Sequence, residues 1–224
     1  MKKFFLNSLI IAALVASAAI VVSCDKDKDK DDDDKGGGGA IDKITAIVED
    51  GANYNNTIDV VKVMGNVISG GWTEIATENY SDGGFTIDFP KTLDAKFTAK
   101  ISSIIIGGDK LTISNPDALI SDPVRFEGWK QNLVCRFEHR NDVSPRTEVW
   151  YRYVNSDVNI SGTYVWVSRP GTEDEEEWTD VYSCKLKKGW NVMYYTRNNS
   201  SKGKIAREYT TNTVSGVKWY YSRW

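Results

Sequence analysis

Cys135, Cys184 and His139 are the candidates for nucleophilic chemistry, and His139 is the only histidine of the 224-residue chain. A cysteine becomes an effective nucleophile when an imidazole takes its proton. Because His139 lies four positions after Cys135, an extended strand separates the two by about 13 Å. Cys184 is the one thiol that His139 could still reach, across strands, and we expect no cysteine nucleophile. The sequence contains no GxSxG, P-loop, HExxH or CxxC motif, and no pair of acids stands out as a glycosidase pair. We therefore expect no catalytic residue and no enzymatic activity.

The two cysteines are also candidates for a disulfide, since an exported protein can keep such bonds. Cys135 alternates onto the face of Phe137, and Cys184 onto the face of Leu186, so both fall on predicted core faces. A bridge over 48 intervening residues would stabilise the fold by roughly 4 kcal/mol, provided the Cα atoms lie within about 7 Å. The alternative is two unpaired buried thiols.

The acidic run at 173–177 is the candidate for a cation site. Calcium takes six to eight oxygen ligands, which loops normally supply from carboxylates separated by carbonyl donors. This run is an uninterrupted block, which favours a solvated hairpin tip in which the charges repel one another. We expect neither a metal site nor a cofactor.

Aromatic residues are the remaining candidates for binding. Of the 26 aromatic residues, 18 follow residue 118, among them seven of the eight tryptophans. Rings on a β-surface can stack on sugars or act as interface hot spots, although cross-strand packing also favours aromatics in strands. The candidate binding surface consists of Trp150, Trp166, Trp190 and Tyr194; core packing is the alternative.

Residues 1–23 have the pattern of a secretory signal, with Lys2 and Lys3 before an apolar run that is too short to span a membrane. The sequence Val21-Val22-Ser23-Cys24 resembles the bacterial lipobox. That resemblance implies cleavage before Cys24 and acylation of its thiol, palmitate included, and two acyl chains anchor a protein stably in a membrane. The alternative is an ordinary thiol beside a spent signal.

Residues 24–40 predict a disordered tether, because 25–35 read DKDKDKDDDDK, carry a charge of −3 and contain no apolar residue. Asp31, Asp32, Asp33 and Asp34 resemble the surface-export signal of Bacteroidetes lipoproteins, which implies an outer-membrane protein facing the cell exterior. DDDDK also matches an engineered enterokinase site; the preceding Asp-Lys alternation favours a natural tether. Residues 36–224 carry only −2, which argues against nucleic-acid binding.

The elements that must position these side chains are strands, since period-two alternation recurs from residue 44 onward. Frequent turn signals predict an all-β, antiparallel sandwich. Gly162 indicates a bulge or a point where another segment closely approaches the strand. A turn at Gly189 should join the strand 181–186 to an antiparallel strand 190–196. The pattern predicts a strand over 101–106 and at most one helical turn over 116–120. We expect two consecutive units, 41–117 and 118–224, with one continuous sandwich over 41–224 as the alternative.

Four segments resemble a group of small Bacteroidetes lipoproteins without an assigned biochemical function: ITAIVEDGANYNNTIDVVKV, GGFTIDFP, VNISG and CKLKKGWNVMYY. The first half is also loosely similar to prealbumin-like sandwiches. Neither resemblance carries catalytic residues. Two hypotheses follow: a glycan- or ligand-binding accessory lipoprotein, or a structural or adhesive envelope protein that binds a protein partner, for example by edge-strand addition.

Overall fold

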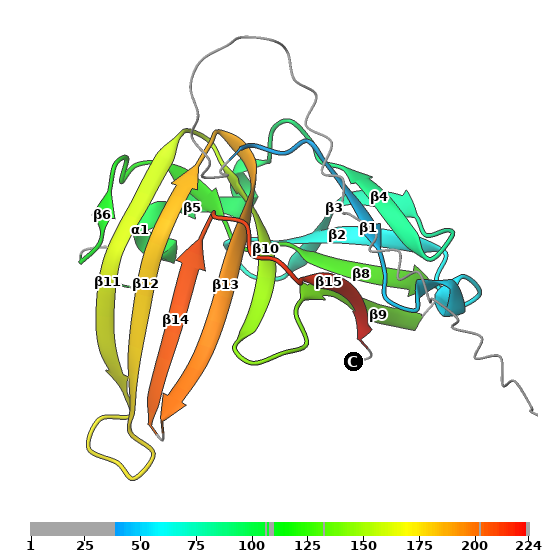
Figure 1. Cartoon of the computed structure of the whole chain (residues 1–224). Helices are drawn as coiled ribbons and strands as arrows, with labels where there is room; N and C mark the ends of the chain where they lie inside the picture. The colour runs from blue at the N-terminus through cyan, green and yellow to red at the C-terminus, as the bar shows by residue number, and fades with distance from the viewer. Residues whose placement is uncertain (1–38, 106, 108–109, 132, 202, 223–224) are drawn as a thin grey trace, which may run out of the picture.

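The computed structural model of the protein describes residues 39–222 except 106, 108–109, 132 and 202. The signal segment 1–23, Cys24 and the run Asp31 to Asp34 lie outside the described residues. The described chain is an all-β, sandwich-like fold, as the alternation predicts (Figure 1).

Fifteen strands and one α-helical turn are present among the described residues. The elements are β1 (Lys43–Ile47), β2 (Val60–Asn66), β3 (Trp72–Asn79), β4 (Gly84–Asp88), β5 (Thr98–Lys100), α1 (Ile101–Ile104), β6 (Thr112–Ile113), β7 (Leu119–Ser121), β8 (Arg125–Lys130), β9 (Leu133–Arg140), β10 (Arg146–Val154), β11 (Val158–Ser168), β12 (Glu176–Leu186), β13 (Gly189–Ser201), β14 (Lys204–Thr210) and β15 (Lys218–Ser222). Two 3-10 turns cover Gly51–Tyr54 and Ala95–Phe97.

Most of these strands belong to one strongly bent sheet, whose order is β3-β2-β8-β9-β10-β13-β14-β12-β11-β6. Strand β15 pairs with β9, β7 pairs with β10 and β5, and β1 forms a separate antiparallel pair with β4. A single residue pair, Arg140 with Glu148, connects β9 to β10. The sheet therefore opens at this junction, and its two parts lie to either side of it in Figure 1.

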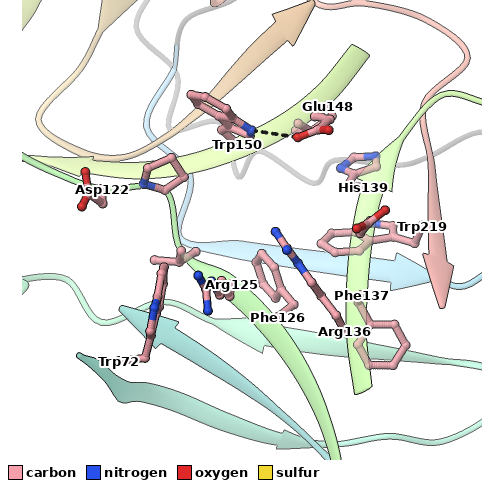
Figure 2. Close-up of a pocket in the computed structure, with 14 residues that line it drawn as sticks. Trp72, Asp122, Arg125, Phe126, Arg136, Phe137, His139, Glu148, Trp150 and Trp219 are labelled. Atoms are coloured by element: carbon pink, nitrogen blue, oxygen red, sulfur yellow. Dashed lines mark hydrogen bonds between the residues drawn. The ribbon is translucent and has the colours of Figure 1, made fainter. Parts of the chain in front are cut away.

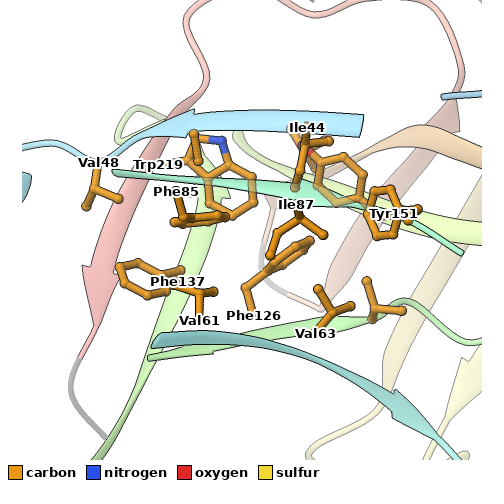
Figure 3. Close-up of a cluster of buried hydrophobic side chains, with 14 of the residues drawn as sticks. Ile44, Val48, Val61, Val63, Phe85, Ile87, Phe126, Phe137, Tyr151 and Trp219 are labelled. Carbon is orange, nitrogen blue, oxygen red and sulfur yellow. The ribbon is translucent and has the colours of Figure 1, made fainter. Parts of the chain in front are cut away.

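The first core lies between the β1–β4 pair and the part of the sheet formed by β2, β8, β9 and β15 (Figure 3). Phe85 reaches from β4 to Phe137 and Trp219, with ring centroids 5.2 Å apart in both contacts. Phe126 packs edge-on against the same Trp219 at 5.0 Å. Burying one side chain of this size stabilises the fold by about 1.5–3 kcal/mol. The alternating apolar residues of β1, β4 and β8 therefore stabilise the first core.

The second core lies under the strands β10 to β12, where β5, α1 and β7 cover the inner face of the sheet. Gly162 adopts a φ of +127°, and Leu111 comes within 3.3 Å of the position that a Cβ would occupy. The pairing of Gly162 with Tyr182 continues in register. The glycine therefore marks a close approach, one of the two predicted alternatives, and not a bulge.

The predicted boundary between residues 117 and 118 does not separate the two cores. Strands β8, β9 and β15 follow it in sequence yet complete the first core, and β5 with α1 precedes it yet packs in the second. The bent sheet runs continuously through both parts. Residues on both sides of position 117 therefore contribute to each core.

Three local predictions are wrong. The segment 101–106 begins with the helical turn α1, and 116–120 leads into strand β7. Strands β12 and β13 run antiparallel as predicted, but they do not pair with each other, because β14 lies between them, parallel to β12 and antiparallel to β13. Gly189 nevertheless has the positive φ expected of a turn glycine, +110°. The turn residues locate the chain reversal between β12 and β13. They do not show that β14 inserts between these two strands.

Candidate functional site

The two cysteines are free thiols in different cores, so the predicted Cys135–Cys184 disulfide is wrong. The Cys135 thiol donates to the Gly128 carbonyl at 3.5 Å, and the Cys184 thiol to the Tyr209 carbonyl at 3.3 Å. Burial raises the pKa of Cys135 to about 11 and that of Cys184 to about 12. Both sulfurs are therefore protonated packing groups, which is the alternative stated above.

His139 belongs to the first core, away from the core that holds Cys184. Its ring stacks on Trp219 with centroids 4.7 Å apart, and its Nδ1 lies 2.9 Å from the Tyr151 hydroxyl. Burial lowers the pKa of His139 to about 4, so the imidazole is neutral at physiological pH. The cross-strand approach of His139 to Cys184, which the sequence left open, does not occur because the two residues belong to different cores.

Two members of the predicted aromatic surface are buried and do not form a surface. Trp190 is 2% exposed and Tyr194 is 9% exposed, both in the first core. Trp190 stacks on Phe89 at 4.4 Å and donates from Nε1 to the Pro90 carbonyl at 2.8 Å. These two residues lie on the face of β13 that packs toward β1 and β4, which explains their burial.

The other two members, Trp150 and Trp166, are half-buried on the opposite face of the sheet. Trp150 stacks on Tyr195 with centroids 4.5 Å apart and planes inclined by 16°. Trp166 stacks on Trp178, its cross-strand partner, at 5.3 Å and 15°. Sequence reasoning missed Tyr195 and Trp178, although the period of two places Tyr195 opposite the buried Tyr194.

A buried ion pair holds the Trp166–Trp178 pair in place. Asp180 is fully buried, and its two carboxylate oxygens each accept a 2.5 Å hydrogen bond from Arg207. The Trp166 indole donates to the same carboxylate at 3.2 Å. The Arg207 guanidinium lies 4.7 Å from the Trp178 ring centre, and that of Arg197 lies 5.2 Å from it. Cation–π contacts of this kind and bidentate pairing fix the planar groups relative to one another.

The same face of the sheet continues from β10 onto β9 and β8. Paired residues of neighbouring strands share a face, and Arg140 pairs with Glu148 across the junction. On this continuation, Arg140 lies 4.5 Å from the Tyr220 ring and Arg125 lies 3.5 Å from the Trp72 ring. We call the whole surface the aromatic–arginine face; it comprises Trp72, Arg125, Arg136, Arg140, Trp150, Trp166, Trp178, Tyr195, Arg197, Arg207 and Tyr220.

A cleft of about 400 Å³ interrupts this face where β9 and β10 separate. Figure 2 shows Trp72 and Arg125 on one side of the cleft and Trp150 with Glu148 on the other. Within the cleft, Glu148 accepts a 3.4 Å hydrogen bond from the Trp150 indole and pairs with Arg146 at 3.1 Å. Its size lies in the range of small-ligand pockets.

Other candidate chemistry is limited in the part of the chain that the structure describes. It contains no cluster of three or more His, Cys, Asp or Glu side chains suited to a metal ion. In the acidic run, Asp174 pairs with Arg169 and the Glu175 carboxylate accepts from the Gly171 amide. No helix in residues 39–222, outside the gaps, has the length and apolarity for a membrane crossing.

Comparison of the chain with protein-family models, with curated proteins and with solved structures gives no match. The aromatic–arginine face and the cleft within it are therefore the features of the molecule that indicate a function.

Proposed function

We propose that the protein is a lipid-anchored envelope lipoprotein of the outer membrane, acylated at Cys24 and facing the cell exterior, that binds a glycan or a related ligand without catalysing a reaction. The observation that carries the proposal is the aromatic–arginine face. It offers half-buried rings in near-parallel pairs, with guanidinium donors between them. Aromatic rings beside polar donors are the arrangement that sugar stacking requires.

The rigidity of this face supports a binding role. The Trp166 ring is fixed by its hydrogen bond to Asp180, and Trp150 by its hydrogen bond to Glu148. Rings that are already ordered lose little conformational freedom when a ligand binds. The two thiols are buried in different cores, and His139 is stacked on Trp219 with its Nδ1 against the Tyr151 hydroxyl, which supports a non-catalytic role.

A glycan array with the full-length chain tests binding, with Trp150→Ala and Trp166→Ala as variants. Val165→Ala is the matched control, because Val165 neighbours Trp166 on β11 but lies 53% exposed on the opposite face. We expect each tryptophan variant to lose most of the signal and the control to keep it. An array on which the wild type retains no saccharide would contradict the proposal.

The anchor has a separate test. Replacing Cys24 with alanine should leave unprocessed precursor, whereas the wild type should yield an acylated mature chain by mass spectrometry. An unmodified mature chain from the wild type would show that Cys24 is not an acylation site.

A second candidate function is adhesion to a protein partner, and exposed valines favour it. Val165, Val167 and Val181 are 53%, 43% and 37% exposed, and the strand pairing places all three on the outer face of β11 and β12. Contiguous exposed apolar groups often mark protein contacts. A pull-down from isolated envelopes should recover a partner that Val165→Asp no longer retains, and recovery of no stable partner would count against this function.

A further inference from the structure

We propose that the cleft between β9 and β10 binds an acidic saccharide, a sugar unit that carries a carboxylate or a sulfate. This inference rests on the proposed glycan-binding function and specifies its ligand. It concerns the part of the aromatic–arginine face where Arg125, Arg136, Trp72 and Trp150 line one cavity.

Two guanidinium groups in the cleft are without an ion-pair partner, although the buried Glu127, which pairs with Arg136 across β8 and β9, attracts Arg125. Neither Arg125 nor Arg136 forms an ion pair with a described residue. Burial, and next the repulsion from Arg136, lower the pKa of Arg125, and this repulsion outweighs the attraction of Glu127. Two like charges held close together in a partly dry cleft favour an anion between them.

Two of the three carboxylates that also line the cleft are paired with arginines, and the third accepts a hydrogen bond from a neutral amide. Glu138 pairs with Arg140 at 3.0 Å and with Arg146 at 3.2 Å, and Glu148 pairs with Arg146 at 3.1 Å. Asp122 accepts a 2.7 Å hydrogen bond from Asn66. These groups orient the walls of the cleft and leave Arg125 and Arg136 to meet a ligand.

A third guanidinium adds positive charge beside the cleft. Arg152 is only 7% exposed, and its Nε and Nη1 atoms are buried without a hydrogen-bond partner among the described residues. It lies 5.4 Å from the ring of Trp150, which is a wall of the cleft. Burial is the main cause that lowers the pKa of Arg152, and Asp122 is the largest opposing charge. An anion bound on the cleft side of Trp150 would be a second negative charge, besides Asp122, that attracts the Arg152 guanidinium.

The shape of the cleft matches one or two sugar units. A planar guanidinium binds a carboxylate or sulfate through two parallel hydrogen bonds, and Trp72 and Trp150 offer apolar surface for the C–H groups of the ring. A volume of about 400 Å³ excludes a folded partner but admits the end of a glycan chain or a short stretch of it.

Calorimetric titration of the full-length chain tests the inference with three oligosaccharides of equal length: an oligogalacturonate, a sulfated chondroitin fragment and a neutral cello-oligosaccharide. We expect an acidic ligand to bind, and its affinity to fall about tenfold or more in Arg136→Gln, because a charge-assisted hydrogen bond contributes about 1.5–3 kcal/mol. Arg125→Gln should act likewise. Arg136→Lys keeps the positive charge but lacks the two parallel donors of the guanidinium, so it should recover part of the affinity. Arg169→Gln is the matched control, since Arg169 is exposed and pairs with Asp174 in the β11–β12 loop.

The outcomes separate this inference from the proposed function. Binding of only one acidic ligand supports the inference and identifies the anion. Equal binding of neutral and acidic ligands, unchanged by either arginine variant, overturns the acidic specificity while glycan binding stands. Binding of none of the three by a folded wild-type chain overturns the acidic-saccharide site, and the glycan array then decides the wider proposal. Circular dichroism checks that each variant is folded. If Arg136→Gln does not fold, the affinity of Arg136→Lys decides the test in its place.

Discussion

Replacing Asp180 with asparagine should destabilise the protein by about 3–5 kcal/mol, the cost of leaving one partner of a buried ion pair without its counter-charge. Asp180 is fully buried and the Arg207 side chain is only 13% exposed, so solvent cannot replace the lost carboxylate. Both guanidinium hydrogen bonds and the Trp166 indole hydrogen bond end on this group. Asparagine keeps the shape but offers one acceptor and no charge. The loss is a large share of the 5–15 kcal/mol typical of a folded domain.

Urea unfolding followed by tryptophan fluorescence measures this loss as a lower midpoint at unchanged slope. Glu177→Gln is the matched control on the same strand, since the Glu177–Lys204 pair is exposed and measures 3.3 Å; it should change stability by less than about 1 kcal/mol. The double variant Asp180→Leu with Arg207→Met should cost much less than the sum of its single changes, because it leaves no unpaired charge. A loss below about 1 kcal/mol in Asp180→Asn, or full additivity in the double variant, would refute the reasoning.

Three further predictions concern the two cores. Gly128→Ala should cost about 1–3 kcal/mol by thermal unfolding, because its Cβ would lie 2.6 Å from the Cys135 sulfur; an unchanged melting temperature would contradict this. His139 has a pKa of about 4 in the fold against about 6.5 when unfolded, so the unfolded state binds the proton first. The free energy of unfolding should therefore fall by up to about 3 kcal/mol between pH 6.5 and 4, and it should fall less in His139→Gln. If NMR shows that His139 of the folded protein titrates near pH 6.5, this prediction is wrong. At pH 8, Ellman's reagent should leave Cys135 and Cys184 unlabelled until urea is added; rapid labelling in the native state would disprove their protection.

Local alternation was sufficient to predict most strands, because a period of two reports directly which residues face a core. The pattern of Phe85 and Ile87 predicts β4 and its buried face. Where apolar residues run without alternation, as in 101–106, the pattern does not distinguish a strand from a helical turn. Strand β8 was missed since its sequence, RFEGWK, contains a glycine that lies under Cys135 and Phe137.

The candidate site was predictable only in part. The sequence shows that Trp150 and Tyr151 face opposite sides of one strand, but it does not show which side another layer covers. Trp190 and Tyr194 turned out to lie beneath the β1–β4 pair, which comes from the far end of the chain. The arginines of the face come from β8, β9, β13 and β14, and only the strand order brings them together with the rings.

The insertion of β14 between β12 and β13 governs the order in which this protein can assemble. Residues 176–201 leave the ribosome before 204–210, so β12 and β13 are both synthesised before the strand that joins them. Until β14 arrives, the facing edges of β12 and β13 have unpaired backbone groups, which are prone to wrong pairing. A parallel pair formed at this separation also closes slowly. Completion of the sheet therefore waits for residues 204–210, and a chain interrupted before residue 204 would leave the facing edges of β12 and β13 unpaired and open to pairing with other chains.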